Sequence, residues 1–170
     1  MVGVKRLAIA VGLALLIGAN SAQATRLPAE PFQTWTDEAS VPTPRGTVAL
    51  IFDRESWERA EVALQAGAIH WYADPAVAEH WPRARPLFYH ELGHIFDWTT
   101  LGVKKRTALT DLFPGWWRAE GSFVEQFAMM YSYCALGAYP WPGWDGYGYA
   151  PPAWKHRRGC KILRTRSRQG

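Results

Sequence analysis

The sequence lacks any apolar run of the length that a transmembrane helix needs, which is about 20 residues. Its one marked run, at residues 7–17, follows Lys5 and Arg6 and precedes Ala-Gln-Ala at 22–24. A basic start, a short apolar segment and an Ala-x-Ala end are typical of a secretory signal peptide. No cysteine at the cleavage point offers lipid attachment. We therefore expect residues 1–24 to be a cleaved signal peptide and the mature chain to be secreted, either extracellular or associated with the cell wall.

Cysteine is equally scarce. The sequence has two cysteines, Cys134 and Cys160, and both lie in its last third. Because export permits disulfide formation, we expect these two residues to be bonded to each other. Closing the loop between them would stabilise the fold by roughly 3 kcal/mol in the chain-entropy model. The alternative is a pair of unrelated free thiols.

Basic residues are few outside the C-terminal end. Residues 25–154 carry 10 basic and 15 acidic side chains, whereas the last 16 residues carry 7 basic side chains and no acidic one. We therefore expect residues 155–170 to form a basic tail that makes at most a weak contact with an anionic cell surface. The acidic balance of the preceding residues argues against a nucleic-acid partner. We expect a monomer.

The sequence His-Glu-Leu-Gly-His at 90–94 is the strongest chemical signal in the chain. On a helix, His90 and His94 project from the same face. Two neutral imidazoles placed in this way bind one Zn²⁺, and Glu91 beside them is suited to act as a general base. Gly93 permits another segment to approach closely, and Asp97 lies where it can hydrogen-bond a ligand histidine. The alternative to a zinc site is a buried histidine pair without metal.

A catalytic zinc site takes three protein ligands and keeps one position open. Position 100 is threonine, so the third histidine that a metzincin has six residues after His94 is lacking. No cysteine precedes the motif, which excludes a deformylase-like site. A carboxylate from a later helix remains, and the candidates are Glu120 and Glu125. Ser122-x-x-Glu125 is also typical of a helix capping box, so the residues alone leave this choice open.

The remaining pattern predicts a small α+β domain at 47–154, preceded by a Pro-rich N-terminal segment at 25–46 that Phe32 and Trp35 anchor. Apolar runs and helical periodicity predict six elements. They are strands at 47–52 and 68–72, and helices at 53–67, 86–98, 107–113 and 122–136. Lys104 and its basic neighbours are expected in a solvated turn.

The motif at 90–94, followed by Glu-x-Phe-Ala at 125–128 on a later helix, resembles the gluzincin-type zinc metallopeptidases. The pattern is similar to the lethal-factor-like group and to small secreted bacterial metallopeptidases, and the match covers residues 86–136. In that family the glutamate of Glu-x-Phe-Ala is the third zinc ligand, which the resemblance transfers to Glu125. The family often has a carboxylate four residues later; here that position is Met129, so the surroundings of the ligand histidines differ.

The resemblance implies a zincin-like fold, in which a short sheet packs on the motif helix and a following helix carries the third ligand. It also implies that an edge strand before the motif helix holds the substrate backbone, and 68–72 is the candidate. Such sites often add a donor for the oxyanion. The chain offers five tyrosines for this role and does not distinguish them: Tyr89, Tyr131, Tyr133, Tyr147 and Tyr149.

A zinc site formed by His90, His94 and Glu125, with Glu91 as general base, predicts a secreted metallopeptidase that hydrolyses a peptide or protein substrate. A zinc amidase that acts on cell-wall peptides would use the same residues. The rival prediction is a non-catalytic, exported, zinc-containing protein that recognises cell-wall glycan or a protein partner.

Overall fold

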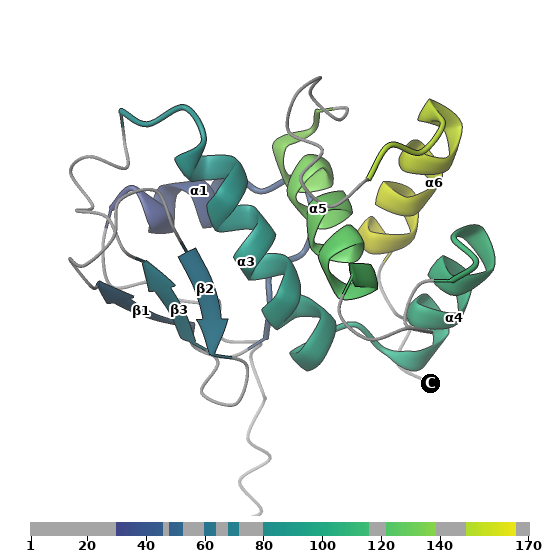
Figure 1. The fold of residues 1–170 in the computed structure, drawn as a ribbon, viewed down its shortest axis with the longest axis horizontal. Coiled ribbons are helices and arrows are strands. Elements are labelled where there is room, and N and C mark those ends of the chain that lie inside the picture. Colours follow the sequence, from purple (N-terminus) through teal and green to yellow (C-terminus); the bar gives the residue numbers. More distant parts are fainter. Residues whose placement is uncertain are drawn as a thin grey trace, which may run out of the picture.

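The computed structural model describes residues 30–45, 48–52, 60–63, 68–71, 80–115, 122–138 and 149–165. These residues form a small α+β arrangement, in which helix α3 lies between a three-stranded sheet and helix α5 (Figure 1). The elements are α1 (Phe32–Glu38), β1 (Ala49–Phe52), β2 (Ala60–Ala63), β3 (Ala68–Trp71), α3 (Ala84–Thr99), α4 (Val103–Leu112), α5 (Ser122–Leu136) and α6 (Ala153–Arg164). The expected signal peptide, Glu120 and the chain end after 165 lie outside the described residues. None of the described helices is long and apolar enough to span a membrane.

The sheet has the strand order β1-β3-β2, with β1 parallel and β2 antiparallel to the central strand β3. The strands predicted at 47–52 and 68–72 are confirmed as β1 and β3. The prediction that 68–72 is an edge strand is wrong, because β3 pairs on both sides. The helix predicted at 53–67 is also wrong at 60–63, where the backbone of β2 pairs with β3. Pairing with a neighbouring strand overrides the weak local preference of such a short segment.

Helix α1 lies where the sequence predicted an extended Pro-rich segment. It begins directly after Pro31, a position where proline is tolerated because the first turn of a helix needs no amide donor. The anchoring role of Phe32 and Trp35 is confirmed, since both are buried. The Phe32 ring lies 4.9 Å from that of Trp71 in β3 and 5.2 Å from that of Phe88 in α3, measured between ring centroids. This segment therefore belongs to the core that joins the sheet to α3.

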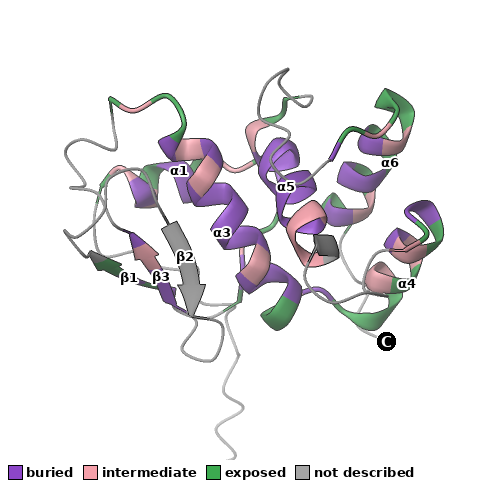
Figure 2. Ribbon diagram, viewed as in Figure 1, coloured by how far each residue is buried: buried purple, intermediate pink, exposed green. Residues whose placement is uncertain are grey.

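Helix α3 contains the motif and extends the predicted helix by two residues at its start and one at its end. Its residues are buried on almost all sides, because the sheet covers one side and α5 the other (Figure 2). Helix α5 has the predicted bounds, and a buried hydrogen bond from Ser132 Oγ to the Pro86 carbonyl (2.7 Å) joins it to α3. The two helices thus form one rigid layer.

Helices α4 and α6 differ from the sequence prediction. The turn expected around Lys104 is the first part of α4, and Lys105 donates a hydrogen bond from Nζ to the Leu163 carbonyl of α6 (2.7 Å). The first residues of the basic tail that was expected at 155–170 are instead part of α6. One face of α6 is buried and carries His156, Gly159, Cys160 and Leu163, at the spacing of an amphipathic helix. The disulfide between Cys134 and Cys160 is confirmed and connects α5 to α6.

Candidate metal centre

Three side chains from two helices meet at one point between α3 and α5. His90 and His94 project from α3, and Glu125 comes from the first turn of α5. The two Nε2 atoms of the histidines are 3.2 Å apart, and the Oε2 atom of Glu125 lies 2.9 Å from His90 Nε2 and 3.3 Å from His94 Nε2. The spacing in the sequence indicated the two histidines, and only the family resemblance indicated Glu125. In the folded chain the three side chains lie together.

This triangle fits a tetrahedral metal ion. Ligand atoms that each lie about 2.0–2.2 Å from a tetrahedral Zn²⁺ are about 3.3–3.6 Å from one another. The distances of 3.2 and 3.3 Å from His94 Nε2 lie near the short end of this range, and the 2.9 Å between His90 Nε2 and Glu125 Oε2 is about 0.4 Å shorter. Two imidazoles and a carboxylate are also a ligand set that catalytic zinc sites use. The residues present can therefore hold the ion after a small movement of the Glu125 carboxylate away from His90.

Gly93 explains how the Glu125 side chain on α5 reaches both histidines on α3. A Cβ atom at this position would lie 3.0 Å from the Ala128 Cα and 3.0 Å from the Tyr131 Cβ, both on α5. Because glycine has no Cβ, the α5 backbone can approach α3 next to the motif. The expectation that Gly93 permits a close approach is confirmed, and the approaching segment is the helix that carries Glu125.

The site is buried on one side and accessible on the other. The His90 side chain is 4% exposed, whereas that of His94 is 11% and that of Glu125 is 29% exposed. Solvent therefore reaches the triangle from the side of His94 and Glu125. An open coordination position, which a catalytic metal requires, would face that side.

The protonation states suit metal binding. Burial lowers the pKa of His90, which favours the neutral imidazole. Burial opposes ionisation of Glu125, but the hydrogen bonds with His90 and His94 outweigh it and lower the pKa of this carboxyl group to about 2. A neutral imidazole and an ionised carboxylate are the forms that coordinate a metal ion.

Glu91 and Asp97 have different surroundings on α3. Glu91 is 5% exposed and lies next to His90 in the sequence, and its role as general base stays a prediction. Asp97 is bound by α4: Arg106 Nη2 lies 2.7 Å from its Oδ1 and donates to its backbone carbonyl at 2.9 Å. The carboxylate thus ties the last turns of α3 to α4. A hydrogen bond from Asp97 to a ligand histidine stays a prediction.

Three of the five candidate tyrosines have their hydroxyl groups bonded elsewhere. The hydroxyl of Tyr89 donates to the Trp35 carbonyl, and that of Tyr131 donates to the Pro42 carbonyl at 2.9 Å. The hydroxyl of Tyr149 is 3.0 Å from a ring nitrogen of His156 in α6. Tyr133 is buried and stacks with Tyr149, and Tyr147 lies outside the described residues.

Met129, which replaces the carboxylate of the resembled family, is a buried core residue.

Comparisons with protein-family models, with curated proteins and with solved structures gave no match for this chain.

Proposed function

We propose that this protein is a secreted zinc-dependent metallopeptidase that hydrolyses peptide bonds. The observation that carries the proposal is the triangle of His90, His94 and Glu125, whose spacing suits a tetrahedral ion. The partial exposure of Glu125 and His94 supports a catalytic site over a closed structural one.

The chemistry divides among the chain's own residues. His90, His94 and Glu125 would hold the ion and remain bound during turnover. A bound Zn²⁺ supplies Lewis acidity, which makes a water molecule easier to deprotonate and a carbonyl group easier to attack. Glu91 accepts the proton of the attacking water and later delivers it to the leaving amine.

The sheet offers a place for an extended peptide. Strand β2 is at an edge of the described sheet, next to α3, so its outer side can pair with a substrate backbone. This replaces the earlier candidate at 68–72, which is the central strand. A substrate held in this way would be a peptide or protein rather than a small molecule.

The test compares wild type with Glu91→Ala on an unstructured protein substrate. We expect the wild type to cleave it, a chelator to abolish cleavage, and Glu91→Ala to retain the metal while losing cleavage. Asp111→Ala, which removes an exposed carboxylate of α4, is the matched control and should cleave normally. A wild type that retains zinc, cleaves neither proteins nor cell-wall peptides and still binds wall glycan in the presence of a chelator would favour the rival binding function.

A further inference from the structure

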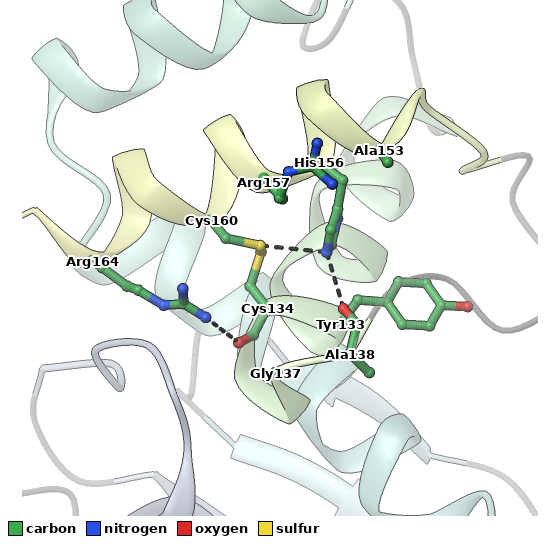
Figure 3. A pocket seen from close by; sticks show the side chains of 9 residues that line it. All are labelled: Tyr133, Cys134, Gly137, Ala138, Ala153, His156, Arg157, Cys160 and Arg164. Carbon is green, nitrogen blue, oxygen red and sulfur yellow. Dashed lines mark hydrogen bonds between the residues drawn. A yellow bond between two sulfur atoms is a disulfide. The ribbon is translucent and has the colours of Figure 1, made fainter.

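A second group of potential metal ligands lies between α5 and α6. It consists of Cys134 from α5 and of His156 and Cys160 from α6, and its ligand atoms all lie within 4.8 Å of one another. All three residues are buried. Figure 3 shows the imidazole of His156 next to the disulfide sulfur of Cys160.

This group has the same construction as the site at His90 and His94. In each case one helix contributes two ligands four residues apart, and α5 contributes the third. On a helix this spacing places both side chains on one face. The sequence predicted the disulfide alone, and the position of His156 beside it comes from the structure.

The nitrogen–sulfur spacing suits a metal. His156 Nε2 lies 3.5 Å from Cys160 Sγ. In a tetrahedral zinc site with Zn–S of about 2.3 Å and Zn–N of about 2.1 Å, these atoms are about 3.6 Å apart. Two thiolates on the same ion are about 3.8 Å apart, so the bond between Cys134 and Cys160 must be reduced before a metal can bind.

A cavity gives access to this group. Its volume is about 380 Å³, and both cysteines, His156, Arg157 and Arg164 are among the residues that line it (Figure 3). A small reductant, a metal ion and a fourth ligand can enter through this space.

The hydrogen bonds of His156 permit coordination through Nε2. In the disulfide form Nε2 donates to the Ala138 carbonyl at 3.0 Å, and Nδ1 therefore accepts from the Tyr149 hydroxyl at 3.0 Å. A hydroxyl group accepts as well as it donates. When Nε2 binds a metal, Nδ1–H can therefore donate to Tyr149, which fixes the tautomer and the orientation of the ring. The change breaks the hydrogen bond to the Ala138 carbonyl.

We propose that reduction of the Cys134–Cys160 disulfide converts this group into a second metal site, which binds a thiophilic cation such as Zn²⁺ through two sulfurs and His156 Nε2. Two small-molecule thiols reduce the disulfide to two cysteine thiols and leave as their own disulfide. Coordination of Zn²⁺ then releases the two thiol protons to solvent. Sulfur and imidazole ligands suit Zn²⁺ and Cu⁺, and exclude Mg²⁺ and Ca²⁺ as preferred ions.

Cobalt spectroscopy on the mature chain tests this proposal. Co²⁺ is added to the oxidised and to the reduced protein, with a phosphine as the reductant so that no added thiol competes. We expect thiolate-to-cobalt absorption in the ultraviolet after reduction only, together with about one further Zn²⁺ bound per chain. Because the site at His90 contains no sulfur, this absorption is independent of the metallopeptidase proposal.

Two variants test the histidine and its partner. His156→Phe should weaken metal binding by the reduced protein and change the cobalt spectrum, and Tyr149→Phe should weaken binding about tenfold or more. His80→Ala, at an exposed histidine, is the control and should bind as the wild type. Three results would each overturn the proposal: no additional metal after reduction, an unfolded reduced chain by circular dichroism even with metal present, or a His156→Phe variant that binds unchanged.

Discussion

Glu125 shows how single residues build the candidate metal centre. The sequence left Glu120 and Glu125 open as third ligand, since one of them also fits a helix cap. In the structure Glu125 contacts both histidines, because a glycine in α3 and an alanine in α5 meet where the helices cross. His90 and His94 were predictable because their spacing is local. The contact with Glu125 depends on helix packing, which only the family resemblance suggested in advance.

Gly93→Ala tests this contact directly. The added Cβ would meet the α5 backbone at Ala128, which cannot move without shifting the whole helix. We expect a loss of about 1–3 kcal/mol in the free energy of unfolding. Zinc affinity should fall as well, because Glu125 is pushed away from the histidines. Denaturant titration and equilibrium dialysis measure the two effects.

Gly102→Ala is the matched control, because a Cβ there would meet nothing within 4 Å. It should leave both the stability and the zinc affinity nearly unchanged. If Gly93→Ala behaves like Gly102→Ala, close packing at Gly93 is not what positions Glu125.

Because of Tyr131, the stability of the folded protein should vary with pH in the alkaline range. Burial raises the pKa of its hydroxyl well above the ordinary value of 10.0, and the hydroxyl donates to the Pro42 carbonyl. The folded protein therefore keeps the proton while the unfolded chain loses it. This contribution to stability is complete below about pH 10 and falls by up to about 1.4 kcal/mol per pH unit above it.

Tyr131→Phe removes that dependence. Denaturant titrations at several pH values should show a smaller decline above pH 10 for the variant than for the wild type. At neutral pH the variant should lose about 1–3 kcal/mol, because the Pro42 carbonyl loses its donor. Equal slopes for both proteins in the alkaline range would contradict the assignment.

At the scale of elements, the sequence predicted helices and strands correctly where the local pattern of apolar residues is strong. Helices α3 and α5 are long and periodic, and their bounds were predicted within two residues. Strand β2 has four residues and owes its conformation to pairing with β3. Helix α6 was missed because its buried face contains histidine, glycine and cysteine, which carry little hydrophobic signal, among many basic residues.

The disulfide should stabilise α6 without affecting the first metal centre. The double variant Cys134→Ala/Cys160→Ala removes the disulfide between residues that are 26 apart in the sequence. We expect a loss of about 3 kcal/mol in the free energy of unfolding. Zinc binding at His90 and His94 should persist, since α6 supplies none of these ligands. Urea titration and metal analysis measure both quantities. Loss of the zinc would mean that the two sites are coupled through α5.

At the scale of the whole molecule, charge is distributed unevenly. Helix α6 has five basic residues and no acidic one, and Arg157, Arg158 and Lys161 on it are exposed. Lys104 is exposed on α4, which packs against α6. The basic segment that was predicted to contact an anionic surface therefore begins with a folded helix, α6. Each basic residue near such a surface contributes about 1 kcal/mol.

We expect weak binding to vesicles that contain anionic phospholipid, and loss of that binding as added salt screens the charges. The triple variant Arg157→Glu/Arg158→Glu/Lys161→Glu should abolish it in a sedimentation assay. Arg83→Glu, at an exposed site before α3, is the control and should reduce binding only slightly. Binding of the triple variant at wild-type level would contradict the role of α6.

Metal content of the oxidised chain tests the central claim most directly, since the intact disulfide then prevents metal binding by Cys134 and Cys160. After incubation with Zn²⁺ and dialysis, the wild type should retain about one zinc per chain by elemental analysis. His94→Ala and Glu125→Ala should each lose it, whereas Glu120→Ala should retain it. A wild type without zinc, or a Glu125→Ala variant with as much zinc as the wild type, would contradict the account.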